Sequence, residues 1–515
     1  MKPLSRRDIL KLTAALVGGA VAASTRPLVN LARGQNKDRR PNFIVLVLDA
    51  MSARNLSLQG YARPTTPGFA RLAERSTVYH NHYAGGNFTT PGAASIFTGV
   101  YPWTHRALLL SGLVERGMER ENIFHFLGEE YTRAAFSHNP FVYLLLGQAS
   151  RDVDVLLDRA AFSIRANRSF PDDRLLNDFP LGYYTFPEFL GASKTYTHPG
   201  SFTLGLAGIL TNKKPDLEPT ADYPRGYPNA NHSTFRIEDV LEGLLGVLQD
   251  IASRQSPFFA YFHLLPPHSP YNPRREFLKP FAKDGFVPPS KPMHPLAVLN
   301  MTPEKLERQR VLYDSFIANV DFEVEQFVNA LESSGVLDTS YLIVTSDHGE
   351  MFERGFYGHG SALMYEPVTH IPLIVHAPGQ TGRRDVRSLT SSTDLVPTIL
   401  SLAGKDIPSG LEGRILPGLG SEEDAERSVF TVFAKENSSF LPLEKSVMSM
   451  RKGRHKLIHY RGYPGYEDRL ELYQLDEDPE ELRDLSASDT VTARRMKEEL
   501  LGLAAAADAP YQRAR

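Results

Sequence analysis

Four continuous apolar runs along the chain predict strands that are buried on both faces. They cover residues 43–48, 258–262, 341–345 and 371–375. A strand with one face in water alternates apolar and polar residues, whereas a run without alternation is typical of a parallel sheet covered by helices on both sides. We therefore expect an open α/β sheet, in which functional side chains collect at the carboxyl ends of the strands.

Apolar residues at three- and four-residue steps predict a long helix that leads into the third of these strands. Its apolar face comprises Phe316, Ile317, Val320, Val324, Phe327, Val328 and Leu331. Gly335 is placed to end this helix. Two shorter helices are predicted where a proline suits the first turn, one opening at Thr66-Pro67 and the other running from Pro91 to Gly99.

Two segments depart from this α/β pattern. Residues 139–231 are rich in Phe, Tyr, Pro and Arg and show no clean alternation of elements, so we interpret them as an insertion or lid over the site. Near the carboxyl terminus, strand-like pieces at 456–460 and 470–475 precede a predicted helix at 491–506. They indicate a small α+β subdomain.

The amino-acid composition excludes several kinds of functional site. The 515 residues are 42% apolar and 23% charged with a net charge of −3, so no general positive field points to a nucleic-acid partner. There is no cysteine. This excludes disulfides, cysteine metal ligands and a cysteine nucleophile.

Residues 1–35 are interpreted as an export signal and the start of a linker. Arg6-Arg7 precedes a weakly apolar run at residues 12–23, which is typical of a twin-arginine signal peptide. The run is too short to span a bilayer comfortably. We expect the twin-arginine translocation machinery to export the folded protein to the periplasm or beyond, with membrane association if the signal stays uncleaved. The alternative is a basic amphipathic tail.

Polar residues end two of the predicted strands. Asp49 follows the run at 43–48, and Asp347-His348 follow the run at 341–345. Carboxylates and an imidazole at strand ends form a suitable corner for a metal ion of hard or borderline character. The alternative is a polar turn with no further role.

Three further side chains are candidates for catalysis. Thr89 precedes a predicted helix, where free N–H groups and the helix dipole favour negative charge and therefore an alkoxide. His268 lies among prolines after an aromatic strand, and His359 lies between two glycines that allow close approach to a ligand. Each has an ordinary alternative: Thr89 or Thr90 caps the helix, and a loop histidine is simply solvated.

An ordered set of short stretches resembles the sulfatase branch of the alkaline phosphatase superfamily. The set comprises residues 41–49, Thr65-Thr66-Pro67, residues 98–102 with His105, residues 267–270, Ser346-Asp347-His348-Gly349-Glu350, Gly358-His359-Gly360, residues 394–398 and residues 471–481. The resemblance implies a doubly wound, mostly parallel sheet with a metal site at its strand ends. It also implies a catalytic domain over residues 40–405 and a C-terminal subdomain over residues 406–515.

Four positions depart from the sulfatase pattern. Sulfatases oxidise a Cys or Ser followed by x-Pro-x-Arg to formylglycine, whereas here Thr89 takes the first position and Gly92 and Ala93 replace the last two. Ala50 replaces the second residue of the usual Asp pair after the first strand. A threonine cannot become formylglycine. The chain is therefore more similar to lipoteichoic acid synthases, phosphoethanolamine transferases and nucleotide pyrophosphatase/phosphodiesterases.

This resemblance implies a role for each candidate residue. One divalent ion, Zn²⁺ or Mn²⁺ with Ca²⁺ and Mg²⁺ as further candidates, would be held by Asp49, Thr89, Asp347 and His348. The ion would activate the Thr89 hydroxyl and neutralise charge on the transferred group. His268 and His359 would hold the ester oxygens or protonate the leaving alcohol.

The function expected from the sequence is an exported, metal-dependent hydrolase or transferase of phosphate mono- or diesters or phosphonate esters. It would act through a covalent threonine intermediate on a small-molecule, glycan or lipid ester. One alternative is an arylsulfatase-like sulfuric ester hydrolase without formylglycine. Another is a non-catalytic binding protein on a degenerate sulfatase fold, although the retention of all four predicted ligands argues against it. The sequence carries no signal for an oligomeric state.

Overall fold

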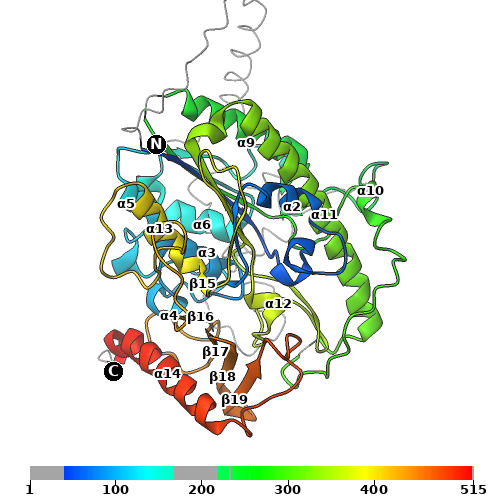
Figure 1. Ribbon diagram of the computed structural model, residues 1–515, viewed down its shortest axis with the longest axis vertical. Coiled ribbons are helices and arrows are strands. Elements are labelled where there is room, and N and C mark those ends of the chain that lie inside the picture. The colour runs from blue at the N-terminus through cyan, green and yellow to red at the C-terminus, as the bar shows by residue number, and fades with distance from the viewer. Residues whose placement is uncertain (1–39, 167–218, 231–232, 255, 298, 513–515) are drawn as a thin grey trace, which may run out of the picture.

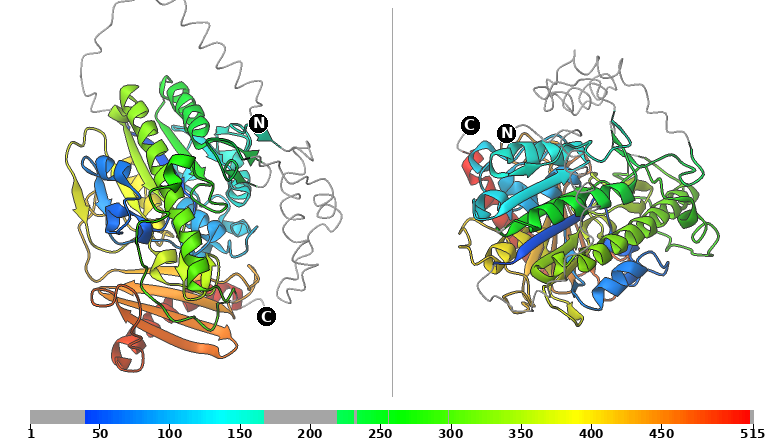
Figure 2. Two further views of the ribbon diagram at one scale, coloured as in Figure 1. Left: turned by 90° about the vertical axis from the view of Figure 1, so that its right-hand side faces the viewer. Right: turned by 90° about the horizontal axis from the view of Figure 1, so that it is seen from above.

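The computed structural model describes residues 40–166, 219–230, 233–254, 256–297 and 299–512, so the predicted export signal lies outside the described residues. Its centre is an eight-stranded sheet with the strand order β14-β2-β13-β10-β1-β9-β4-β5 (Figures 1 and 2). The strands are β1 (Asn42–Leu48), β2 (Thr77–Tyr79), β4 (Thr132–Ser137), β5 (Val155–Leu156), β9 (Phe258–Leu264), β10 (Ser340–Thr345), β13 (Leu373–His376) and β14 (Arg384–Val386). Neighbours pair in parallel except at β13, which is antiparallel to both β10 and β2.

Helices cover both faces of this sheet, which confirms the predicted α/β, doubly wound and mostly parallel architecture (Figure 1). One face of β1 packs in a core with α2 (Pro67–Ala73), α9 (Ile237–Ala252) and α11 (Pro303–Ser333). The other face packs with α3 (Thr89–Thr98), α5 (Ile123–Leu127), α6 (Pro140–Gln148) and α13 (Leu395–Leu402). Successive residues of β1 enter opposite cores, because strand side chains alternate between faces. The continuous apolar run of β1 is explained by these two cores.

The predicted apolar face of the long helix is confirmed, since all seven of its residues are buried in α11. The start of α2 differs in detail from expectation. Thr66 occupies the N-cap position, but its side chain makes no capping hydrogen bond. Asp321 of α11 accepts hydrogen bonds from the N–H groups of Gly68 at 2.7 Å and Phe69 at 2.8 Å instead. A carboxylate from a neighbouring helix thus satisfies the free donors at this helix end.

The predicted insertion at residues 139–231 is partly built into the main domain. The first part of this range forms regular elements, namely α6 and then β5, the edge strand of the central sheet. The helix is apolar on almost every side, and such a helix is buried in a core rather than laid over a surface. Residues 167–218 and 231–232 lie outside the described residues, and the role of a lid stays a prediction.

A second, antiparallel sheet forms the C-terminal subdomain (Figure 2). It comprises β16 (Ser428–Phe433), β17 (Ser446–Lys452), β18 (His455–Tyr463) and β19 (Tyr466–Gln474), with α14 (Thr490–Gln512) packed on it. The buried ammonium of Lys456 on β18 lies 3.0 Å from the carboxylate of Glu366 and 2.9 Å from that of Glu481, which links the subdomain to the main domain. Within the described ranges, no helix has the length and apolar character needed to cross a membrane.

Candidate metal centre and nucleophile

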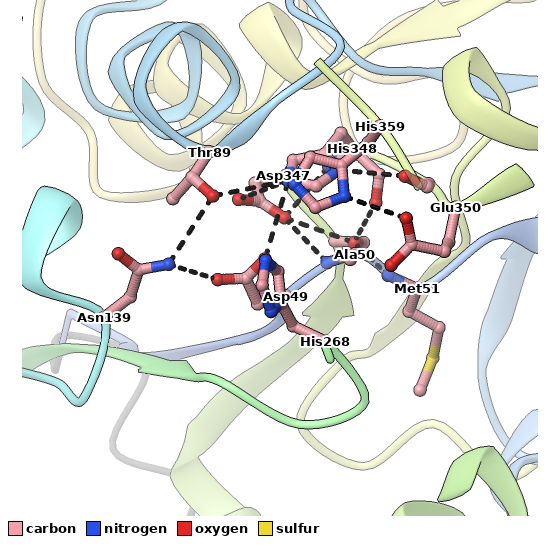
Figure 3. Close-up of polar contacts among 12 residues, drawn as sticks. Asp49, Ala50, Met51, Thr89, Asn139, His268, Asp347, His348, Glu350 and His359 are labelled. Atoms are coloured by element: carbon pink, nitrogen blue, oxygen red, sulfur yellow. Dashed lines mark hydrogen bonds and ion pairs between the residues drawn. The ribbon is translucent and has the colours of Figure 1, made fainter. Parts of the chain in front are cut away.

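The candidate site forms where four adjacent strands end (Figure 3). Across β10, β1, β9 and β4, one register row of the sheet comprises Thr345, Val47, His263 and Ser137. A side chain two residues further along a strand points to the same face. This periodicity carries Asp347, Asp49 and Asn139 onto the face to which Val47 belongs, and α3 packs on that face.

Asp49, Asp347 and His348 are arranged to hold one metal ion. Their nearest ligand atoms lie within 4.8 Å of one another, and all three side chains are fully buried. Nε2 of His348 is 3.5 Å from Oδ1 of Asp49 and 3.6 Å from Oδ2 of Asp347. A tetrahedral ion with bonds of about 2.1 Å keeps its ligand atoms roughly 3.4 Å apart. These separations therefore suit a shared ion.

The hydrogen bonds around these groups leave the inward-facing atoms free. Oδ2 of Asp49 accepts from Asn139 at 2.6 Å, and Oδ1 of Asp347 accepts from the N–H of Ala50 at 3.2 Å. By contrast, Oδ1 of Asp49 and Oδ2 of Asp347 have no hydrogen-bond partner in the part of the chain that the structure describes. Nδ1 of His348 bonds the carbonyl of Gly349 at 2.9 Å, which leaves the Nε2 lone pair for a ligand bond. The residues present fit a divalent ion.

Electrostatics also favour a cation between the carboxylates. Burial and the charge of Asp49 raise the pKa of Asp347 well above its usual value. Burial acts in the same direction on Asp49, but its interactions with the neighbouring His268 and His263 outweigh burial, so the pKa of Asp49 is lowered. Burial and the charge of His359 lower the pKa of His348, which keeps its imidazole neutral. Two buried carboxylates thus share a site that a cation would neutralise.

Thr89 turns its hydroxyl toward this centre. It is the first residue of α3, and the N-cap position belongs to Phe88, so neither Thr89 nor Thr90 caps the helix. Oγ1 of Thr89 is 3.4 Å from Nε2 of His348 and 3.5 Å from Nδ2 of Asn139. Thr90 instead donates to the carbonyl of Leu110. Of the two threonines, Thr89 has the position of a nucleophile.

A carboxylate–histidine pair borders the same centre. Nδ1 of His359 donates to Oε1 of Glu350 at 2.9 Å, and the hydroxyl of Tyr271 donates to Oε2 of Glu350 at 3.1 Å. Burial lowers the pKa of His359, but the Glu350 carboxylate outweighs it, so this pKa is raised and the ring holds its proton. The His359 ring centroid is 4.2 Å from that of His348 and 4.9 Å from that of His268.

Comparison with protein-family models shows to which family this chain belongs. The Sulfatase family model matches residues 41–405, which is more than half of the chain, and a model for the N-sulphoglucosamine sulphohydrolase C-terminal region matches residues 353–506. The chain belongs to the sulfatase family. It is a member of a hydrolase family whose metal-dependent chemistry suits the ion site at Asp49, Asp347 and His348.

Several curated sulfatases are similar to this sulfatase-family chain. It is 27% identical to arylsulfatase K of Bos taurus over 271 residues, which cover 46% of this chain and 49% of the relative. It is 25% identical to N-acetylglucosamine-6-sulfatase of Homo sapiens over 382 residues, covering 72% of the chain and 62% of the relative. The chain thus spans about half to two thirds of these relatives. N-acetylgalactosamine-6-O-sulfatase of Bacteroides thetaiotaomicron is 21% identical and matches 96% of the chain and 98% of the relative.

Solved structures share the fold. Phosphonate monoester hydrolase of Agrobacterium radiobacter superposes with a TM-score of 0.64 at 20% identity, covering 91% of this chain and 96% of that one. The phosphonate monoester hydrolase of Silicibacter pomeroyi gives a TM-score of 0.59 at 19% identity, with coverages of 90% and 94%. These likenesses support the sulfatase-like fold with its C-terminal subdomain.

Two departures from the sulfatase pattern have structural explanations in this family member. A Cβ on Gly92 would lie 2.3 Å from the carbonyl oxygen of Asp347, so only glycine lets α3 approach the candidate metal-binding loop at residues 346–350 this closely. Ala50 adopts a left-handed conformation with φ of 61°, and its N–H is directed at Oδ1 of Asp347. Its carbonyl accepts from Tyr313 at 2.6 Å. Ala50 thus supports the site through its backbone.

Sequence reasoning missed three polar residues at the site. Asn139 and His263 contact Asp49, and Glu350 holds His359. Their positions carried a usable signal, because Asn139 and His263 lie at the ends of strands β4 and β9. The strand that precedes Asn139 contains Thr132 and Arg133, however, and so lacks the continuous apolar run that revealed its neighbours.

Proposed function

We propose that this sulfatase-family hydrolase cleaves or transfers phosphate esters, including diesters and phosphonate monoesters, through a covalent phosphoryl-threonine at Thr89. The observation that carries the proposal is the position of Thr89, whose hydroxyl points at the candidate metal centre from the first turn of α3. Threonine cannot be converted to formylglycine, and the chain contains no cysteine. The nucleophile proposed is therefore an ordinary hydroxyl.

An ordinary hydroxyl favours phosphate over sulfate because of how its ester must be released. Formylglycine hydrate has a second hydroxyl on the same carbon, which expels sulfate by breaking a C–O bond without any attack on sulfur. Thr89 has no second hydroxyl, so water or an alcohol must attack the transferred atom itself. A phosphoryl group surrounded by positive charge accepts that attack. A sulfuryl group carries less charge for the site to neutralise, so its release from threonine should stall.

In the first proposed step, the hydroxyl oxygen of Thr89 attacks phosphorus and the bond from phosphorus to the leaving oxygen breaks. The hydroxyl proton of Thr89 passes to solvent, from which a proton returns in the second step. The leaving oxygen takes a proton from His359, which Glu350 holds in its protonated form. A divalent ion, when bound, supplies Lewis-acid activation of the hydroxyl and charge neutralisation of the phosphoryl group. Nδ1 of His268 donates to the carbonyl of Ser269 at 2.6 Å, so His268 would hold a phosphoryl oxygen through Nε2 only when that nitrogen also carries a proton.

In the second step, His359 accepts a proton from water or an acceptor alcohol as that oxygen attacks phosphorus. The bond between phosphorus and Oγ1 of Thr89 breaks, and the threonine is regenerated when a proton returns to it. The same histidine thus acts first as an acid and then as a base. Asn139 donates to Asp49 and lies beside the hydroxyl of Thr89, so it fixes the nucleophile relative to the ligand set.

A sulfuric ester hydrolase is the second candidate, favoured by the names of the relatives, which include an arylsulfatase and two sugar sulfatases. Turnover of nitrophenyl phosphodiesters, phenylphosphonate monoesters and nitrophenyl sulfate, each with Zn²⁺ and with Mn²⁺, distinguishes the two. The phosphate proposal predicts that the best phosphorus ester turns over at least 100-fold faster than the sulfate, and that co-expression with a formylglycine-generating enzyme changes nothing. Comparable multiple turnovers of the sulfate would favour the second candidate.

We further propose that the protein acts outside the cytoplasm on a glycan or lipid ester. The twin-arginine pattern at Arg6-Arg7 supports export of the folded chain. Fusing residues 1–40 to a reporter that is exported only when folded tests this idea, with Arg6→Lys and Arg7→Lys together as the control. Retention of both reporters in the cytoplasm would contradict it.

A further inference from the structure

His263 lies beneath the candidate metal centre, inside the sheet. It belongs to β9 and pairs in register with Val47 of β1 and Ser137 of β4. Asp49 comes two residues after Val47, just beyond the end of β1, so His263 is one row deeper than this candidate ligand. The imidazole is fully buried. A polar ring in a row of sheet core needs partners for its nitrogens, because buried polar groups are stable only when they are bonded.

One ring nitrogen has a conventional partner and the other faces two carboxylates. Nδ1 of His263 lies 2.9 Å from the hydroxyl of Tyr261, which is two residues earlier on the same face of β9. Nε2 lies 3.5 Å from Oδ2 of Asp49 and 3.6 Å from Oδ2 of Asp347. It makes no hydrogen bond with any residue that the structure describes. The free nitrogen is therefore aimed between the two predicted carboxylate ligands.

The surroundings decide which atom carries the proton. The Tyr261 hydroxyl can either donate to Nδ1 of His263 or accept from it, whereas ionised carboxylates can only accept. A hydrogen on Nε2 and a lone pair on Nδ1 therefore match both sets of neighbours. The opposite tautomer would direct a lone pair at two carboxylates, which is electrostatically unfavourable. The separations of 3.5 and 3.6 Å would suit a metal ligand as well, but a nitrogen that carries hydrogen cannot ligate.

We propose that His263 is a positioning residue of the metal centre, whose Nε2–H holds the carboxylates of Asp49 and Asp347 together before an ion binds. The two buried carboxylates repel each other, and a donor between them offsets that repulsion. Asn139 holds Asp49 through the same oxygen that faces His263. Hydrogen-bonding partners behind metal ligands commonly change metal affinity 10- to 100-fold when removed. The competing view is a core histidine that fills space, bonds Tyr261 and leaves metal affinity untouched.

The test measures metal affinity and needs no substrate. Zn²⁺ dissociation constants come from competition with a chromophoric chelator, and urea unfolding of the metal-free proteins reports whether each variant is folded. His263→Phe keeps a buried ring and removes the donor, whereas His263→Gln keeps an N–H donor. Tyr261→Phe leaves His263 in place but removes the hydroxyl that fixes its tautomer. His82→Phe is the matched control, because His82 is another fully buried histidine, bonded to Thr390 and outside the site.

We expect His263→Phe to weaken Zn²⁺ binding by 10- to 100-fold, with a smaller loss in Tyr261→Phe and partial recovery in His263→Gln. His82→Phe should stay within about two-fold of the parent protein. Co²⁺-loaded His263→Phe should keep the visible spectrum of the parent, because no ligand has been removed. Parent-like Zn²⁺ affinity in folded His263→Phe or Tyr261→Phe would overturn the proposal. So would a Co²⁺ spectrum that shows the loss of a nitrogen ligand.

This inference rests on the metal centre of the proposed function, but the two can fail separately. A parent protein that binds no divalent ion contradicts the proposed function. A parent protein that binds Zn²⁺ while its His263 variants bind equally well contradicts only the positioning role.

Discussion

A Cβ on Gly92 would lie 2.3 Å from the carbonyl oxygen of Asp347. The helix that presents Thr89 therefore docks directly on the loop that presents Asp347 and His348, with no side chain between them. One backbone contact thus positions the proposed nucleophile relative to the candidate metal ligands, and this contact makes the geometry of the site sensitive to very small changes.

Gly92→Ala should therefore damage the site more than the fold. The added methyl must push α3 away from the candidate metal-binding loop, so we expect at least a 100-fold loss of kcat and a cost of about 1–3 kcal/mol in unfolding free energy. Steady-state kinetics and urea unfolding measure the two effects. Gly246→Ala in α9 is the control, because a Cβ there meets nothing within 4 Å. It should keep full activity and gain up to about 1 kcal/mol. Unchanged kcat in Gly92→Ala would show that the contact does not set the geometry.

Asp347→Asn should abolish tight metal binding while the protein stays folded. The substitution removes the ligand charge and also one of two buried carboxylates that repel each other, so the metal-free protein should be no less stable than the parent. Metal content after dialysis tests the loss of binding, and the urea unfolding midpoint of the metal-free protein tests its stability. The same measurements on His348→Ala should also show lost metal. Full metal occupancy in either variant would mean that the ligand set is misassigned.

Glu350→Gln should impair proton donation by His359. Without the carboxylate, the lowering effect of burial on His359 is opposed mainly by the weaker influence of Asp49, so the pKa of His359 falls and less of the imidazolium is available to the leaving oxygen. We expect kcat/KM to drop about 10- to 100-fold for alkyl phosphoesters, which need a proton, and to change little for nitrophenyl esters. Tyr271→Phe removes only the second contact to Glu350 and should have a smaller effect. Equal losses for both leaving groups would argue against general acid catalysis by this pair.

Stability should fall steeply below about pH 6.5 because of buried neutral histidines. Burial lowers the pKa of His105 to about 3 and that of His370 to about 4. At acidic pH these histidines bind protons in the unfolded chain but not in the folded chain. The stabilisation present above pH 6.5 is therefore lost as the pH drops toward the lowered pKa values. Between pH 6.5 and 5 each histidine should cost about 2 kcal/mol.

Urea unfolding of metal-free protein at pH 7 and pH 5 measures this loss. Removing the titrating group in His105→Gln should make the difference between the two pH values smaller by about 2 kcal/mol. An identical pH dependence in His105→Gln and the parent would contradict the assignment.

The sequence was sufficient to predict the elements whose burial is uniform. β1, β9 and β10 are continuous apolar runs because both of their faces are covered, and Asp49 and Asp347 stand out at the ends of such runs. Prediction was weaker where polar residues interrupt a buried strand. Hydroxyl residues break the apolar runs of β16 and β17, and the strand before Asn139 has a polar start, so the sequence does not reveal these strands.

Asn139 and His263 could not be assigned to the site from the sequence because their contacts depend on the order and register of the strands. Asn139 is 90 residues from Asp49 in the chain, and their contact depends on β4 lying beside β9 and β9 beside β1. Nothing local to residue 139 indicates that order. The same holds for His263, because its proposed role depends on the carboxylates of Asp49 and Asp347, which lie one row above it in the sheet.

The central claim is that Thr89 carries the transferred phosphoryl group, and peptide mass spectrometry of acid-quenched turnover mixtures tests it most directly. With a phenylphosphonate monoester as substrate, the peptide that contains Thr89 should gain one phosphonyl group during turnover. The adduct should be absent from Thr89→Ala, which should be inactive, and present on serine in Thr89→Ser with some turnover retained. An unmodified Thr89 peptide during rapid turnover, or an adduct on another residue, would contradict the account.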